Sequence, residues 1–279
     1  MSLRTDQVHD ASGTGGRLKI RVLGCHGSDQ VLEEGRERRQ CRTCGFLVNG
    51  TVMVDAGTIG EALPLGEQRR IRYVLLSHLH FDHIQGLPTF ADNLVDEAID
   101  PVVLVGTPAV LDGLQEHIFN DKVYPNFLKL PDPRRPIFTL QSIQPDKESL
   151  VGELRVTPIA VNHLVPTVGF LIRDGESTFL YSGDTYETED IWKVAARERT
   201  LKAAFIETSF PDDMAELARA SKHLTPSLFS REFTKMGRPD LPVYVYHLKP
   251  RVREQITREL AGLKIKHLTV LQEGQEITI

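Results

Sequence analysis

The sequence places four potential metal ligands within six consecutive positions. Residues 78–83 read His78-Leu79-His80-Phe81-Asp82-His83, directly after the apolar run 73–77. Imidazoles and carboxylates at this density are costly to bury unless a cation holds them. The ligand set suits a first-row cation such as zinc, because soft copper prefers thiolates and magnesium prefers oxygens alone. The hexad therefore predicts a metal site at the end of a strand.

The spacing of these ligands also carries a family resemblance. The hexad resembles the HxHxDH signature of the metallo-β-lactamase superfamily of dinuclear metallohydrolases. That resemblance implies an α/β fold of the four-layer αββα sandwich type, with two metal ions at one edge between the sheets. It implies metal chemistry without identifying the substrate.

Composition limits the class of protein. The chain has 279 residues, of which 41% are hydrophobic and 25% are charged, and its net charge is −5, as in soluble globular proteins with a large core. No apolar run is long enough to cross a bilayer, and residues 1–16 lack the pattern of a signal peptide. We therefore expect a cytoplasmic protein with a flexible tail over residues 1–16 and a single domain over 17–279.

The same numbers constrain the partners. An acidic net charge without a cluster of Lys and Arg argues against nucleic acid as a partner. A small anionic ligand held at cationic metals is compatible with this charge, and so is a homodimer.

Apolar runs alternate with helical stretches along the chain, which favours an α/β class. Asn49-Gly50 predicts a hairpin turn, and Thr107-Pro108 and Thr225-Pro226 each predict the start of a helix. The charged segment 33–39 is expected to be a mobile loop. Strands are expected near residues 18–22, 46–48, 51–54, 73–77, 102–105, 154–160, 168–172, 179–182, 203–207 and 243–246.

The three cysteines, Cys25, Cys41 and Cys44, do not suggest a disulfide framework, because their number is odd. Cys41 and Cys44 form a CxxC pair that is compatible with half of a structural zinc site, with a redox couple, or with ordinary buried thiols. We favour buried thiols, since a second pair of cysteines is missing from the sequence.

Three further candidate ligands each follow a strand-like run. They are His163, Asp184 and His247, and Gly183 allows a sharp turn before the aspartate. Side chains at the ends of several strands can converge on one point outside a sheet. Taken singly, each is equally compatible with a capping or hydrogen-bonding residue.

The family resemblance implies how these ligands are shared. One metal would take His78, His80 and His163, the other would take Asp82, His83 and His247, and Asp184 would bridge the two. Two divalent ions, zinc first and manganese or iron as alternatives, can share a water and supply hydroxide at pH 7. The resemblance also places Asp55 beneath the site, where it would orient a ligand imidazole; the alternative is an ordinary turn aspartate.

Segments toward the C-terminus narrow the chemistry. The stretches 205–210 (FIETSF), 221–226 (SKHLTP) and 246–250 (YHLKP) resemble the class II cyclic-nucleotide phosphodiesterases, with Lys222 where that pattern favours glycine. With the hexad and Gly183-Asp184, the similarity runs in order from about residue 18 to residue 250. It implies hydrolysis of a 3′,5′-cyclic nucleotide, cyclic AMP or cyclic GMP, to a nucleoside 5′-monophosphate.

Phosphodiester cleavage requires that the departing alkoxide be protonated or metal-bound. His223 can deliver that proton, and Glu207 can stabilise its imidazolium. The expected mechanism is attack by a metal-bridging hydroxide with His223 as proton donor, so that Asp82, Glu207 and His223 are the candidate catalytic residues. The alternative for His223 is a helix N-terminal residue that satisfies loop backbone.

The sequence indicates the residues that contact the substrate less clearly than it indicates the metal ligands. Lys249 can neutralise a phosphate, and Phe81, Phe170 and Tyr186 lie near ligands in sequence and can offer stacking faces. The main alternative function is a ribonuclease Z-like RNA phosphodiesterase, which would share the Glu and His pair. Lactone or thioester hydrolysis, or a non-catalytic nucleotide-binding scaffold, are further alternatives.

Overall fold

The computed structural model describes residues 17–34, 37–95, 97 and 99–279. Its principal strands are β1 (Lys19–Gly24), β2 (Gln30–Glu34), β3 (Glu37–Cys41), β4 (Gly45–Val48), β5 (Val52–Val54), β6 (Tyr73–Leu75), β7 (Val102–Gly106), β10 (Phe138–Ser142), β11 (Ser149–Val151), β12 (Leu154–Ala160), β13 (Val168–Asp174), β14 (Ser177–Tyr181), β15 (Leu201–Glu207), β16 (Val243–Tyr246), β17 (Leu268–Val270) and β18 (Glu276–Thr278). The short pair β8 (Pro131–Asp132) and β9 (Arg135–Pro136) forms a separate ribbon. The predicted tail over residues 1–16 lies outside the described residues.

The helices are α1 (Leu65–Gln68), α2 (Phe81–Ile84), α3 (Gly86–Leu94), α4 (Pro108–His117), α5 (Asp190–Arg197), α6 (Ala215–Ser221), α7 (Pro226–Thr234) and α8 (Arg253–Gly262), with 3-10 turns at η1 (Asp212–Met214) and η2 (Pro250–Val252). Among the described residues, no helix is both long enough and apolar enough to cross a membrane.

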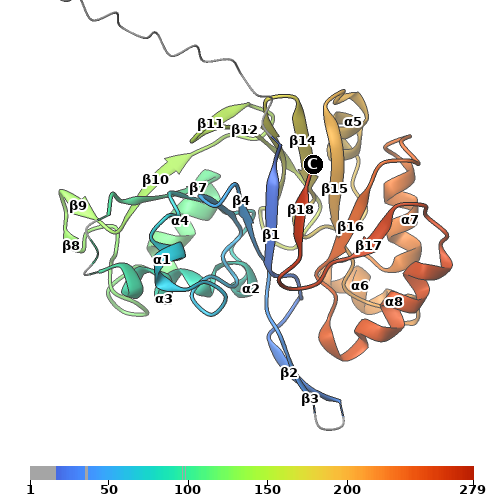
Figure 1. Ribbon diagram of the computed structural model, residues 1–279, viewed down its shortest axis with the longest axis horizontal. Coiled ribbons are helices and arrows are strands. Elements are labelled where there is room, and N and C mark those ends of the chain that lie inside the picture. The colour runs from blue at the N-terminus through green and yellow to red at the C-terminus, as the bar shows by residue number, and fades with distance from the viewer. Residues whose placement is uncertain (1–16, 35–36, 96, 98) are drawn as a thin grey trace, which may run out of the picture.

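Two seven-stranded sheets face each other at the centre of the molecule. Their strand orders are β10-β7-β6-β5-β4-β1-β18 and β11-β12-β13-β14-β15-β16-β17. Figure 1 shows α1, α3 and α4 on the outer side of the first sheet and α5, α7 and α8 on the outer side of the second. This arrangement confirms the expected four-layer αββα sandwich.

Three layers of apolar side chains hold the four layers of structure together. The central layer lies between the sheets, where the Phe46 ring packs edge-on against the rings of Tyr181, Phe205 and Tyr246 at 5.5 to 5.8 Å between centroids. Separate clusters join the first sheet to α3 and α4 and the second sheet to α5, α7 and α8. Because both faces of each sheet are packed, the ends of the strands are held in fixed relative positions.

The parallel strands determine where loops from the two sheets meet. In the first sheet β5, β6, β7 and β10 run parallel, and in the second β14, β15, β16 and β17 do so. The carboxyl ends of parallel strands lie along one edge of a sheet, so the loops that follow them emerge together. The candidate ligands lie on such loops, on α2, which directly follows the loop after β6, or on the loop after β12.

The local turn signals are confirmed. Asn49 and Gly50 adopt φ values of 49° and 73° in the turn between β4 and β5, as the central residues of a type I′ turn require. Helices α4 and α7 begin at Pro108 and Pro226. Thr225 Oγ1 accepts a hydrogen bond from the Leu228 amide, whereas the Thr107 side chain does not cap α4.

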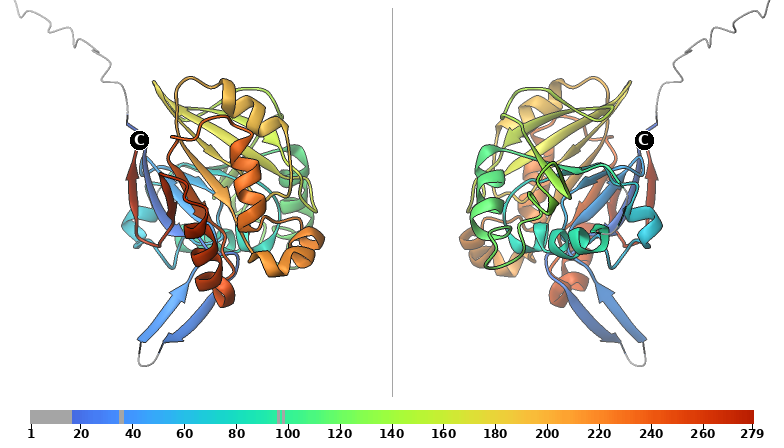
Figure 2. Two further views of the ribbon diagram at one scale, coloured as in Figure 1. Left: turned by 90° about the vertical axis from the view of Figure 1, so that its right-hand side faces the viewer. Right: turned by 90° about the vertical axis from the view of Figure 1, so that its left-hand side faces the viewer.

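The prediction of a mobile loop over residues 33–39 is wrong for residues 33–34 and 37–39, and residues 35–36 lie outside the described part of the chain. Strands β2 and β3 pair there as an antiparallel hairpin that projects from the body of the molecule in both views of Figure 2. The register places Glu33 opposite Arg38, with 3.0 Å between Oε1 and Nη2. Opposite charges that face one another across two strands stabilise the pairing, so a charged sequence does not exclude strands.

Candidate metal centre

Four separate segments of the chain deliver side chains to one point between the two sheets. The loop after β6 supplies His78 and His80, and α2 supplies Asp82 and His83. The loops after β12, β14 and β16 supply His163, Asp184 and His247. All seven predicted ligands are brought together.

The first group consists of His78, His80, His163 and Asp184, whose ligand atoms all lie within 4.8 Å of one another. His163 Nε2 is 3.0 Å from His80 Nδ1. Asp184 Oδ2 is 3.7 Å from His78 Nε2 and 4.0 Å from His163 Nε2. Three imidazole nitrogens and a carboxylate oxygen therefore converge on one point.

The second group shares Asp184 with the first. Asp184 Oδ2 is 3.2 Å from both His83 Nε2 and His247 Nε2. Asp82 Oδ2 is 3.3 Å from His247 Nε2. One carboxylate oxygen thus lies between the two groups, which is where a bridging ligand has to be.

Several buried atoms at this point lack hydrogen-bond partners. Among the described residues, His78 Nε2 and both carboxylate oxygens of Asp184 are buried and accept or donate no hydrogen bond. Buried polar atoms are almost always satisfied, and an unpartnered carboxylate is especially unfavourable. Nitrogen and oxygen donors of this kind suit divalent first-row ions, so the residues present fit a metal centre.

Hydrogen bonds on the far side of each ring set the tautomer of most ligand histidines. The Nδ1 atoms of four ligands have these partners: Ser77 Oγ for His78 (2.9 Å), Asp55 Oδ2 for His83 (2.7 Å), the Lys222 carbonyl for His163 (3.0 Å) and Ser209 Oγ for His247 (2.8 Å). A proton on Nδ1 leaves Nε2 with its lone pair directed at the cluster. His80 has the reverse orientation, with Nδ1 toward His163.

The pKa shifts of four ligand histidines favour metal binding. Burial lowers the pKa values of His78, His80, His163 and His247, which favours the neutral imidazole that can bind a metal. His83 differs, because Asp184 and Asp55 outweigh the effect of burial and raise its pKa.

Asp55 lies beneath the cluster and is fully buried. Its carboxylate accepts hydrogen bonds from the Ser77 amide (2.8 Å), Ser77 Oγ (2.8 Å), Tyr181 Oη (2.6 Å) and His83 Nδ1 (2.7 Å). Its backbone is left-handed, with φ of 56°, and so is that of His247, with φ of 70°. Strained backbone of this kind is retained where the surrounding structure requires it. This geometry supports the orienting role for Asp55.

We expect Asp55→Asn to weaken zinc binding about 10- to 100-fold, because the amide nitrogen cannot accept the His83 proton. Competition with a chromophoric chelator measures the affinity. Asp146→Asn is the matched control, because Asp146 also has a left-handed backbone, with φ of 62°, but is exposed and distant in sequence from every ligand. Equal affinities of the parent and the Asp55 variant would contradict the role.

His223 and Glu207 form a buried pair beside the cluster. His223 Nδ1 is 2.8 Å from Glu207 Oε1, and the Thr185 amide donates to the same oxygen at 3.1 Å. Burial disfavours the imidazolium, but the Glu207 carboxylate outweighs it and raises the pKa of His223. The ring lies 5.1 Å between centroids from both His163 and His247. An imidazole whose protonated form is favoured by Glu207 therefore lies next to both groups of ligands.

The residues predicted to contact the substrate lie in environments that range from exposed to buried. Phe81 is 62% exposed beside two ligands, and Lys249 Nζ donates to the Gly27 carbonyl at the base of the hairpin formed by β2 and β3. The prediction for Phe170 is wrong. Its ring is fully buried between the sheets and stacks on Tyr181 at 6.4 Å, so no substrate can reach it.

Lys222 departs from the glycine of the phosphodiesterase pattern, and its backbone shows why glycine suits the position. It follows α6 with φ of 59°, in the left-handed region that glycine adopts most easily. Its carbonyl accepts from His163 Nδ1, and its Nζ lies 5.3 Å from the centre of the Tyr186 ring. The lysine therefore keeps the turn that orients a ligand.

Some residues of the site escaped the sequence analysis. Ser77 and Ser209 hydrogen-bond to ligand rings. The only sequence signal for Ser77 is a small hydroxyl directly before the first ligand, and for Ser209 it is a position two residues after Glu207. Cys44 Sγ lies within 4.8 Å of the ligand nitrogens of His83 and His247. Burial, with Asp184 and Asp82 nearby, raises the pKa of its thiol. Cys25, Cys41 and Cys44 are all buried.

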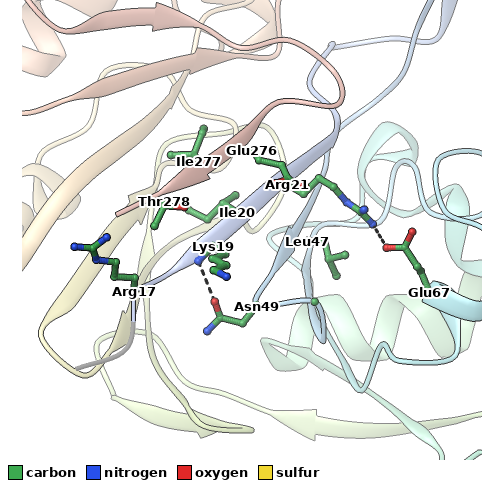
Figure 3. A pocket seen from close by; sticks show the side chains of 11 residues that line it. Arg17, Lys19, Ile20, Arg21, Leu47, Asn49, Glu67, Glu276, Ile277 and Thr278 are labelled. Atoms are coloured by element: carbon green, nitrogen blue, oxygen red, sulfur yellow. Dashed lines mark hydrogen bonds and ion pairs between the residues drawn. The ribbon is translucent and has the colours of Figure 1, made fainter. Parts of the chain in front are cut away.

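A separate concavity of about 610 Å³ lies at β1 and β18 (Figure 3). Lys19 and Arg21 line it, and Arg21 pairs with Glu67. None of the metal-cluster residues takes part in it. The chemistry therefore belongs to the cluster between the sheets.

Comparison with known proteins agrees with this geometry. The sequence model of the beta-lactamase superfamily domain matches residues 51–247. A probable 3′,5′-cyclic-nucleotide phosphodiesterase of Yersinia pestis is 28% identical over 253 residues, which cover 80% of this chain and 70% of that protein.

Solved structures extend the comparison. Unliganded yeast PDE1 superposes with a TM-score of 0.78 at 18% identity, covering 94% of this chain and 99% of the yeast chain. The short form of human tRNase Z superposes with a TM-score of 0.65 at 14% identity, covering 93% and 98%. At these sequence identities, the structural similarity shows a shared fold and nothing more.

Proposed function

The chain belongs to the beta-lactamase superfamily, and from this premise we propose that it is a metal-dependent hydrolase that converts 3′,5′-cyclic nucleotides to nucleoside 5′-monophosphates. The observation that carries the proposal is the buried pair of His223 and Glu207 at the edge of the ligand cluster. The similarity to a cyclic-nucleotide phosphodiesterase along most of the chain supports the same substrate class.

The metal requirement follows from the ligands. His78, His80 and His163 would hold one divalent ion, Asp82, His83 and His247 the other, with Asp184 shared. Such ions lower the pKa of bound water toward neutrality and neutralise phosphate charge. Zinc fits the nitrogen-rich set best, and manganese or iron accept the same donors.

The protein's own groups provide the proton. His223 Nδ1 is occupied by Glu207, so Nε2 is the nitrogen free to donate. As the P–O bond to the 3′ oxygen breaks, His223 transfers this proton to the departing oxygen, and Glu207 stabilises the imidazolium beforehand. Glu207 is itself fixed by the Thr185 amide and by Ser209 Oγ, at 3.1 Å each. The pair is thus pre-organised for protonating a poor leaving group.

RNA cleavage of the ribonuclease Z type is the competing function, because it needs the same proton donor. The charges on the described part of the hairpin formed by β2 and β3 argue against this function. Arg38 pairs with Glu33 across the strands, so this arm does not present unpaired cations to a polyanion at that position. Nucleic-acid binding would require many lysine or arginine contacts with phosphates.

A substrate panel on the metal-loaded protein tests the proposal. We expect release of adenosine 5′-monophosphate from cyclic AMP, identified by chromatography against the 3′-monophosphate, and no processing of a precursor transfer RNA. Cleavage of the RNA with steep salt dependence, and no turnover of cyclic AMP or cyclic GMP, would favour the competing function.

A further inference from the structure

A groove of about 610 Å³ opens beside the first group of ligands. One wall is the start of α4, with Pro108 and Ala109, and the other is the loop between β12 and β13, with Leu164 and Pro166. His163 is part of the lining and is also in the ligand cluster. The His163 side chain itself is buried, so the groove adjoins the ligand cluster at this residue, and its volume is typical of small-molecule sites.

The lining is apolar and uncharged. Among the described residues that line it, His163 has the only titratable side chain, and the other polar side chains are the hydroxyls of Thr107 and Thr167. Leu164 is 58% exposed, although it directly follows a ligand. An exposed leucine inside a functional concavity is a surface that a ligand can cover.

The loop that carries Leu164 is tied down on several sides. The Val161 amide donates to the Thr167 carbonyl and the Val168 amide to the Ser77 carbonyl, both at 3.1 Å. Asn162 Nδ2 donates to the Glu187 carbonyl at 2.8 Å. The groove is thus pre-formed, and a ligand does not have to order it, which favours affinity.

We propose that this groove binds the uncharged aromatic substituent of the phosphodiester, which in a cyclic nucleotide is the base; the inference rests on the proposed function. A flat ring with a few polar edge atoms matches apolar walls that carry two hydroxyls. A second phosphate has no cationic partner among the lining residues. The groove therefore selects substrates with one phosphate and an aromatic group over polyanions.

Two substitutions test the groove from opposite walls. Leu164→Ala removes contact area, and Ala109→Trp fills the space from an exposed position at the start of α4. We expect Leu164→Ala to raise KM for cyclic AMP about five- to twentyfold, and Ala109→Trp to raise it further, with kcat and metal content close to those of the parent. Leu150→Ala is the matched control, because Leu150 is 61% exposed and does not line the groove.

A second substrate shows whether the groove recognises the nucleotide base or aromatic groups in general. If both substitutions raise KM for cyclic AMP and also for bis(nitrophenyl) phosphate, the groove accepts aromatic groups in general; if only cyclic AMP is affected, it recognises the base. Either result supports the proposal. Unchanged KM for cyclic AMP in both variants would overturn it.

Equilibrium dialysis of adenosine 5′-monophosphate against the metal-loaded protein tests binding in the groove independently of catalysis. If the parent hydrolyses no phosphodiester, the proposed function fails. Binding of the nucleotide that weakens in Leu164→Ala but not in Leu150→Ala would still support the groove. Equal binding by all three proteins, or none by the parent, would overturn it.

Discussion

Replacing Asp184 by asparagine is expected to lower turnover of cyclic AMP about a thousandfold and to reduce the metal content below two ions per chain. The carboxylate oxygen Oδ2 lies 3.2 Å from ligand nitrogens of both His83 and His247 and 3.7 Å from that of His78. Both its oxygens are buried without hydrogen-bond partners among the described residues. An amide offers one neutral oxygen in place of a charged pair, so the charge that holds two cations together is lost.

Elemental analysis after dialysis, together with a turnover assay, measures this effect. Zinc should raise the melting temperature of the parent far more than that of the variant, because only tight binding to the folded state stabilises it. Asp240→Asn serves as control, since Asp240 is exposed and pairs with Lys266 at the surface. Two ions per chain and parental turnover in the Asp184 variant would refute the bridging assignment.

Replacing His223 by alanine is the second substitution with a large expected effect. We expect kcat for cyclic AMP to fall about 10²- to 10⁴-fold, as for loss of a general acid, with metal content unchanged. The imidazole is held by Glu207 at 2.8 Å and lies outside the predicted ligand set, so its removal should leave the seven ligands in place.

The leaving group distinguishes a proton donor from a structural histidine. Nitrophenolate departs without protonation, so hydrolysis of bis(nitrophenyl) phosphate should change little in His223→Ala. His117→Ala is the control, because His117 is 64% exposed on α4. An equal loss of activity on both substrates would show that His223 supports the structure of the site and does not donate a proton.

Much of the site could be predicted from the sequence because its ligands follow strands. His163, Asp184 and His247 are far apart in the chain, but each lies after a strand whose carboxyl end meets the same edge. The αββα layering came from the resemblance of the hexad to a known family. Strand periodicity alone would have predicted only an α/β class.

Other features could not be predicted, for identifiable physical reasons. Phe170 was expected to offer a stacking face, but residues 168–172 of β13 are all buried, because one face packs between the sheets and the other beneath helices. A strand covered on both faces has no exposed side for an aromatic ring. The serine hydroxyls that hydrogen-bond to ligand rings, Ser77 and Ser209, have too weak a sequence signal to reveal that role.

The left-handed backbone at Asp55, Lys222 and His247 has a practical consequence for engineering. Glycine adopts this conformation with the least strain, so a design rule that relieves left-handed backbone would suggest glycine at these three positions. Two of those replacements would discard a carboxylate and an imidazole that the centre uses. A stabilised version of this protein should therefore be designed with residues 55 and 247 held constant.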